Sequence, residues 1–291
     1  MQLNEEEYNQ FMEIYPPLIF FVAKRKGMID KGFRYENFLD IPIGERLTFR
    51  DKLFENPKLI DEYVATHKKN LPNETIEIVL GFKNFVAGEF MVLKYLKAYS
   101  ILLNDKVAYG VLGLASDFED FFGPNLPAYV KTVLLPFKGK IIFDGFLQSY
   151  NMRFGGGYKS SFNESYKEAK ATYGIVTSLP FDNQPAHAQL SLEEQVRYFM
   201  KNADHRERFE KELNQLLKNN PELLPVYHEE RGKTDARSFK KQLKPLGLNK
   251  AYYAILEGVL ICSGVTKNEL DETLRKIVPV KKWDWVYIFR A

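Results

Sequence analysis

Runs of alternating apolar and polar residues, separated by short turns, occupy the middle of the chain. The clearest extends from Tyr129 to Phe137, turns at Lys138-Gly139 and continues from Lys140 to Leu147. A period of two residues on both sides of a short turn predicts an antiparallel hairpin. Thr75 to Leu80, Phe90 to Leu103 and Lys106 to Leu114 are also strand-like, with Asn104-Asp105 as a further turn. We therefore expect an antiparallel β-sheet or small barrel.

Helical patterns flank this region. Asn4, followed by three glutamates, is typical of a helix start, and Pro16-Pro17 is expected to interrupt the helix that it opens. Tyr158 to Tyr173 has helical spacing and follows three glycines. Ser191 with Glu194, and Thr266 with Glu269, have the spacing of capping boxes. Thr234 to Lys244 and Asn249 to Cys262 are predicted to be helices, and Trp283 to Phe289 a strand.

These patterns predict an α+β protein. Its expected parts are a helical N-terminal arm (1–73), a central β region with one helix (74–180) and a helical C-terminal domain (190–291) that ends in a short strand. The 291 residues are 45% hydrophobic and 27% charged, which excludes collagen-like, disordered and disulfide-rich chains.

The location of the protein is predicted from what the sequence lacks. A single cysteine, Cys262, cannot form an internal disulfide, and the first residues are acidic rather than basic and apolar. No apolar run reaches the roughly 20 residues that cross a bilayer. We expect a cytoplasmic protein with no membrane partner. The excess of lysine over arginine, 29 against 12, favours a bacterial origin.

Basic residues concentrate between positions 231 and 250. The net charge of the chain is only +3, but this segment has seven basic residues and one acidic residue. Such a cluster is typical of a surface that binds nucleic acid or another polyanion, and also of an ordinary solvated face. Two helices joined at Pro245-Leu246-Gly247-Leu248 would have the outline of a helix-turn-helix, although the apolar second helix looks buried. The basic residues are Arg231, Lys233, Arg237, Lys240, Lys241, Lys244 and Lys250.

A glycine-rich turn before the predicted helix at Tyr158 is a candidate anion site. Free N–H groups at a helix start attract phosphate, and nearby cations and hydroxyls would add to the attraction. The pattern is not a P-loop, because Tyr158 stands where the second glycine is needed. The alternative is a flexible exit from the sheet, capped by Ser160. The candidate residues are Arg153, Gly155, Gly156, Gly157, Lys159 and Ser160.

A metal-dependent phosphodiesterase or nuclease is a second hypothesis. Asp144 near a strand end, followed by Glu168 and Lys170, resembles the acidic and basic set of such enzymes. In those enzymes Glu-x-Lys lies on a strand, whereas here it lies in a predicted helix, which favours coincidence. No zinc motif, calcium loop or nucleophile elbow is present, and no cofactor or metal is expected.

Aromatic residues in unusual places suggest a third hypothesis, a protein-interaction module or homodimer. Exposed aromatic residues would mark a contact surface, whereas buried ones would pin a loop or close a sheet. The leading hypothesis remains a non-catalytic binding protein for nucleic acid or another polyanion. The residues concerned are Phe118, Phe121 and Phe122 in an acidic loop, and Trp283, Trp285, Tyr287 and Phe289 near the end.

Overall fold

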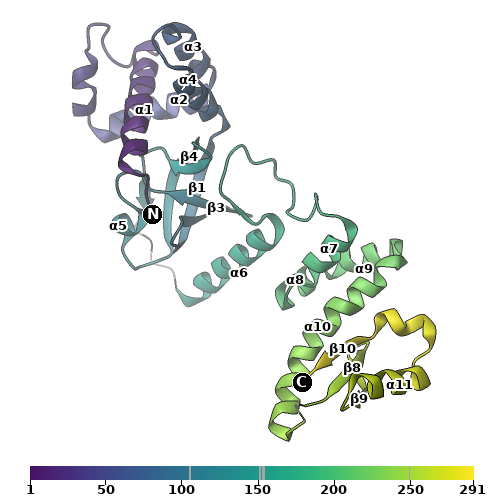
Figure 1. Ribbon diagram of the computed structural model, residues 1–291. Coiled ribbons are helices and arrows are strands. Elements are labelled where there is room, and N and C mark those ends of the chain that lie inside the picture. The colour runs from purple at the N-terminus through teal and green to yellow at the C-terminus, as the bar shows by residue number, and fades with distance from the viewer. Residues whose placement is uncertain (105, 151, 153–154, 249) are drawn as a thin grey trace. The chain divides into compact units, whose positions relative to one another are not determined.

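The computed structural model describes residues 1–104, 106–150, 152, 155–248 and 250–291. The chain divides into two compact units, Met1–Gln184 and Pro185–Ala291 (Figure 1). Both contain helices and strands, so the α+β prediction is confirmed. Among the described residues, no helix combines the length and the apolar character needed to cross a bilayer.

The first unit is built around a closed five-stranded barrel. Its strands pair in the order β1-β2-β3-β5-β4, and β4 pairs with β1 to close the ring. Every pairing in the ring is antiparallel except that between β3 and β5, which is parallel. The bounds are β1 (Val86–Tyr95), β2 (Ser100–Asn104), β3 (Val107–Leu112), β4 (Ala128–Phe137) and β5 (Lys140–Phe143).

Two short strands extend the barrel. β6 (Gln148–Tyr150) pairs antiparallel with β4, and β7 (Ile175–Val176) pairs parallel with β3. The hairpin with its turn at Lys138-Gly139 is confirmed, because both residues have the positive φ that such a turn needs. Phe90 to Leu103, predicted as one strand, instead belongs to the two paired strands β1 and β2. Of the turn predicted at Asn104-Asp105, Asp105 lies outside the described residues.

Helices cover the barrel on two sides (Figure 1). The side chains of Phe11, Leu18 and Leu53 are buried in the same core as those of the barrel residues Phe90 and Leu134. Residues 1–73, predicted as a region of their own, therefore share their hydrophobic core with the sheet. The helices on this side are α1 (Glu5–Arg25), η1 (Tyr35–Asp40), α2 (Ile43–Glu55), α3 (Lys58–His67), α4 (Asn73–Gly81) and η2 (Phe82–Asn84).

Two sequence predictions about these helices are wrong. Pro16 and Pro17 lie inside α1, whose neighbouring residues Tyr15 and Leu18 are buried. Tertiary packing therefore maintains this helix despite the backbone hydrogen bonds that proline removes. Thr75 to Leu80, predicted as a strand, belongs to α4, where Val79 is fully buried. The helix start predicted at Asn4 is confirmed, and the structure shows that Asn4 forms a capping box with Glu7.

Helix α6 (Gly156–Tyr173) covers another part of the barrel. Its Tyr166 and Ala169 pack with Ile101 and Leu103 of β2, whereas Leu102 belongs to the main core. This alternation follows from the opposite directions of successive side chains in a strand. The predicted helix from Tyr158 to Tyr173 is thus confirmed.

The second unit combines helices with a three-stranded antiparallel sheet in the order β10-β8-β9. Capping boxes at Ser191 and Thr266 are confirmed. The helices are α7 (Leu192–Phe199), α8 (Ala203–Arg208), α9 (Glu210–Asn219), η3 (Pro221–Leu223), α10 (Leu224–Leu243), η4 (Lys244–Leu246), α11 (Lys267–Ile277) and η5 (Val280–Trp285), and the strands are β8 (Tyr252–Leu256), β9 (Val259–Gly264) and β10 (Tyr287–Arg290).

The helix predicted from Asn249 to Cys262 is wrong. These residues include β8 and β9, joined by a turn in which Glu257 and Gly258 have φ values of 51° and 85°. A strand after the turn at Gly247 excludes the helix-turn-helix outline (Asn249 itself lies outside the described residues). At the end of the chain, the predicted strand is confined to β10, because Trp283 and Trp285 belong to η5.

Candidate functional site

Asp144 lies at the centre of a buried polar cluster at one end of the barrel. It directly follows β5, and its N–H donates to the Val133 carbonyl at 2.9 Å. Its Oδ1 accepts hydrogen bonds from the Phe146 N–H at 3.1 Å and from the Thr132 hydroxyl at 3.4 Å. Gly145, which separates Asp144 from Phe146 in the sequence, has a φ of 88°, a left-handed conformation that glycine adopts without strain.

Two helices supply the partners of the other oxygen. Tyr15 of α1 donates its hydroxyl to Asp144 Oδ2 at 3.2 Å, and Arg50 Nη1 of α2 lies 3.4 Å from the same oxygen. The Arg50 guanidinium also lies over the Phe146 ring, 5.5 Å from its centroid, and its Nε lies 3.1 Å from Asp51 Oδ1. The cluster therefore ties two helices to the barrel.

Burial dominates the electrostatics of this cluster. It raises the pKa of Asp144 to about 6, although Arg50 and the hydrogen bonds from Phe146, Tyr15 and Thr132 favour the carboxylate. Burial, assisted by the charge of Asp144, also raises the pKa of Tyr15 well above its usual value of 10. Tyr15 therefore remains a hydrogen-bond donor at neutral pH.

A cavity of about 280 Å³ adjoins Asp144. Its wall is mainly aromatic and aliphatic, and comes from α1, from the segment that leads into α2 and from loops at the barrel end. Phe121 of α5 (Phe118–Phe122) is half-exposed and lines it, whereas Phe118 is fully buried. The lining residues are Tyr8, Phe11, Met12, Tyr15, Pro16, Ile19, Phe38, Ile43, Arg46, Leu114, Ala115, Ser116, Phe121, Phe143, Asp144, Gly145 and Phe146.

The candidate nuclease residues are not brought together. Asp144 is buried in the main core, whereas Glu168 and Lys170 are exposed on α6. All contacts described above for the Asp144 carboxylate come from other residues. Among the residues that the structure describes, no group of three or more His, Cys, Asp or Glu residues is arranged to hold a metal ion.

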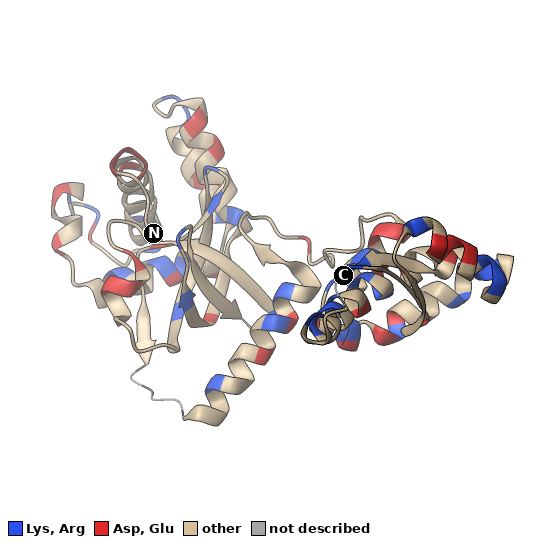
Figure 2. Cartoon of the chain, turned by 60° about the horizontal axis from the view of Figure 1, so that its bottom comes forward, with Lys and Arg blue, Asp and Glu red and all other residues tan. Residues whose placement is uncertain are grey.

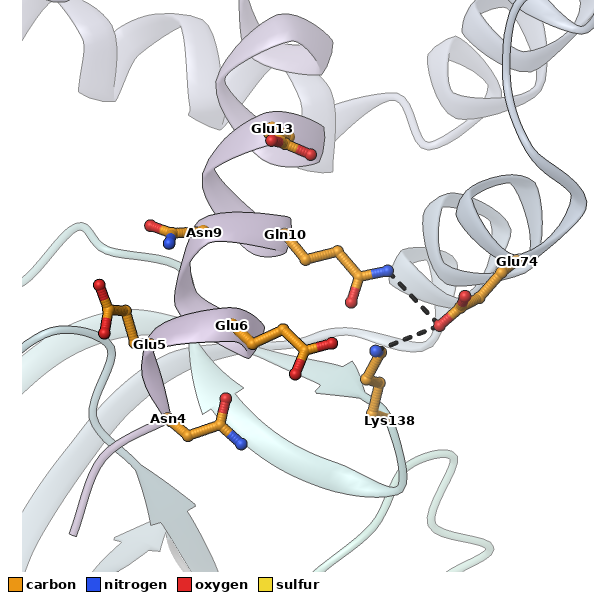
Figure 3. Close-up of a pocket in the computed structure, with 8 residues that line it drawn as sticks. All are labelled: Asn4, Glu5, Glu6, Asn9, Gln10, Glu13, Glu74 and Lys138. Atoms are coloured by element: carbon orange, nitrogen blue, oxygen red, sulfur yellow. Dashed lines mark hydrogen bonds and ion pairs between the residues drawn. The ribbon is translucent and has the colours of Figure 1, made fainter.

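A larger surface hollow, of about 770 Å³, lies beside the start of α1 (Figure 3). Glu74 Oε1 accepts a hydrogen bond from Gln10 and lies 3.1 Å from Lys138 Nζ. Glu5 and Asn9 point away from this pair in Figure 3. The carboxylates are open to solvent and do not converge on one point, so this hollow carries no chemistry.

The glycine-rich turn leads into the N-terminus of α6, which has no side-chain cap. Gly155 is the N-cap of α6, and no side chain caps the helix, so Ser160 does not have the capping role considered above. Gly156, Gly157, Lys159 and Ser160 are exposed, and Arg153 lies outside the described residues. A Cβ added at any of the three glycines would meet no atom of the described residues within 4 Å.

The basic segment separates into paired and unpaired side chains. Lys233 forms ion pairs with Glu229 and Glu230, and Arg231 lies 3.7 Å from Asp235. The other five side chains are exposed, and none is paired with a carboxylate among the residues described (Figure 2 shows the basic residues near the C-terminus). We call these five the basic surface; they are Arg237, Lys240, Lys241, Lys244 and Lys250.

The terminal aromatic residues pack within the second unit. Trp285 stacks on His228 with ring centroids 4.6 Å apart, and the Trp283 indole N–H donates to the Val278 carbonyl. Phe289 is buried, and Lys240 Nζ lies over its ring at 5.8 Å. Phe289 thus helps to close the sheet, Trp285 packs against α10 from η5, and Trp283 remains 38% exposed.

Comparisons of the chain with known protein families, with curated proteins and with solved structures find no match.

Proposed function

We propose that this protein is a non-catalytic binding protein that contacts nucleic acid or a similar polyanion through its basic surface. The observation that carries the proposal is the set of five exposed cations at the end of α10 and in the turn that follows it, none of which has a carboxylate partner among the described residues. Unpaired cations can neutralise phosphates and release their counterions, which supplies most of the affinity of non-specific binding.

The type of side chain in this region supports contact with phosphates, which positions a protein but carries no sequence information. Recognition of a DNA sequence commonly places a helix or a two-stranded ribbon in the major groove. Here Arg237 and Lys241 lie on the last two turns of α10, and Lys244 and Lys250 follow it. We therefore propose binding that depends little on sequence and strongly on salt.

Charge reversal at three positions tests the proposal. Lys240 is left unchanged because it contacts the Phe289 ring; the variant Arg237→Glu/Lys241→Glu/Lys244→Glu changes only freely exposed side chains. The matched control is Lys211→Glu/Lys218→Glu/Lys276→Glu, which makes the same charge change at exposed lysines of the same unit. We expect the first variant to lose at least 100-fold in affinity for labelled duplex DNA and the control to lose far less. Equal losses would reduce the proposal to an effect of net charge.

A further inference from the structure

We propose that the cavity beside Asp144 binds a small apolar monocarboxylate. This site is separate from the basic surface and lies wholly within the first unit. Its walls come from α1, from the segment around the start of α2 and from the barrel end, so three parts of the first unit form a half-open cavity. A cavity lined by apolar side chains with a few convergent polar groups is the usual form of a small-molecule site.

The carboxylate of Asp144 is not available to a ligand. Its two oxygens already have four partners, namely Phe146, Thr132, Tyr15 and Arg50, and its side chain is inaccessible to solvent. The cluster therefore shapes the cavity wall rather than offering an acceptor. An amine ligand would find no free negative charge there.

Arg46 gives the cavity an available positive charge. Its Nε donates to the Ile41 carbonyl at 3.0 Å, which fixes one edge of the guanidinium. Within the described residues, its two Nη groups have neither a carboxylate nor another acceptor. These groups form a fork that matches the two oxygens of a carboxylate.

Two hydroxyl groups supplement this fork. Tyr8 and Ser116 line the cavity and are half-buried, and neither hydroxyl has a hydrogen-bond partner in the described part of the chain. The remaining wall is mainly apolar, including Phe38, Phe143 and Phe146, and the polar groups of Tyr15 and Asp144 in it are already paired with each other. One cation, two hydroxyls and an aromatic wall fit a ligand with one carboxylate and a hydrocarbon body.

The size of the cavity limits the length of that body. At about 280 Å³ it lies just below the range of roughly 300–1,000 Å³ that holds drug-sized ligands. A single aromatic ring or a short aliphatic chain fits this volume, whereas a long fatty acid does not. We use 3-phenylpropionate and hexanoate as probes of the two types.

The test compares an acid with its uncharged analogue by isothermal titration calorimetry of the full chain. We expect saturable, one-to-one binding of at least one of the two acids, and binding of the matching amide at least tenfold weaker, because charge-assisted hydrogen bonds are about twice as strong as neutral ones. No heat from either acid at millimolar concentration, or equal affinity for acid and amide, would overturn the proposal.

Two variants locate the site. Arg46→Gln should abolish the preference for the acid over the amide, while Ile43→Trp, at a largely exposed position of the wall, should obstruct the cavity and weaken both ligands. Lys58→Gln removes an exposed cation of the same unit and should leave the affinities unchanged. Circular dichroism checks that each variant is folded. An unchanged acid preference in folded Arg46→Gln would contradict the assigned role of Arg46.

Discussion

The Arg50 guanidinium lies 3.4 Å from the Asp144 carboxylate, and both side chains are almost completely withdrawn from water. Taking two charges out of water is costly, and the pair repays that cost only with further hydrogen bonds. Tyr15, Thr132 and the Phe146 N–H supply these bonds to Asp144. The cluster makes the first unit sensitive to pH and to the loss of either partner.

The pKa of Asp144 is the first testable property. Because its value of about 6 exceeds the usual 3.8, the folded protein binds this proton more tightly than the unfolded chain. The resulting stabilisation is complete below about pH 4 and is lost as the pH rises through 6. Relative to Asp144→Asn, the free energy of unfolding should fall by about 2 kcal/mol between pH 4 and pH 7.5. Urea unfolding followed by circular dichroism measures the free energy of unfolding at each pH. Parallel pH profiles of the two proteins would refute a raised pKa of Asp144.

Removal of Arg50 should be costly in a way that depends on pH. Arg50→Met leaves the Asp144 carboxylate buried without its countercharge, which should lower the free energy of unfolding by about 3–5 kcal/mol at pH 7. The loss should be smaller at pH 5, where Asp144 is protonated. Carbon-13 NMR of the Asp144 carboxyl group should also show its pKa rising above that in the unaltered protein.

Arg25→Met, which removes an exposed ion pair with Glu62, is the control and should lower the free energy of unfolding by less than about 1 kcal/mol. A cost for Arg50→Met that is identical at both pH values would show that Asp144 does not titrate in this range.

Two glycines in helices should respond oppositely to alanine. A Cβ at Gly232 of α10 would lie 2.2 Å from the Tyr287 Cβ, so Gly232→Ala should destabilise the second unit by about 1–3 kcal/mol. In Gly157→Ala, the new Cβ in α6 would meet no atom of the described residues within 4 Å, so this change should stabilise the first unit by about 0.5–1 kcal/mol. Both tryptophans lie in the second unit, so their fluorescence reports on Gly232→Ala alone. Stabilisation by Gly232→Ala would contradict the close packing of α10 on β10.

Local side-chain signals predicted three helix starts correctly, those at Asn4, Ser191 and Thr266. The capping boxes at Asn4, Ser191 and Thr266 depend on residues three positions apart, so the sequence contains everything that forms them. The hairpin with its turn at Lys138-Gly139 could also be predicted from adjacent residues, since the glycine indicates the turn. Such features need no knowledge of the rest of the fold.

The β8–β9 hairpin was missed because its turn has an uncommon sequence. Both turn residues have positive φ, a conformation for which Asn-Gly and Asp-Gly are the usual signals, whereas this chain has Glu257-Gly258. Strand β8 is also apolar on both of its faces. Tyr253 and Ile255 pack in one cluster and Ala254 in another, so the alternation typical of a half-buried strand is absent.

The candidate site could be predicted only in part. Asp144 stood out as an acidic residue beside a buried strand, but its partners Tyr15 and Arg50 lie far away in the sequence and in helices. No short-range pattern links them, and Arg46 has no local motif either. The exposure of the basic surface likewise depends on tertiary packing, which leaves its five side chains exposed while Arg231 and Lys233 are half-buried. By contrast, the ion pairs of Arg231 with Asp235 and of Lys233 with Glu229 follow the i, i+4 spacing of a helix.

The salt dependence of nucleic-acid binding tests the central claim most directly. Fluorescence anisotropy with labelled duplex DNA, single-stranded DNA and RNA between 50 and 200 mM salt would give the affinity and its slope against salt. If all five cations of the basic surface contact phosphates, the logarithmic slope for duplex DNA should be about −4 to −5. Arg237→Glu/Lys241→Glu/Lys244→Glu should reduce it to about −2, since two cations remain. Absence of binding at 50 mM salt, or a slope that this variant leaves unchanged, would contradict the account.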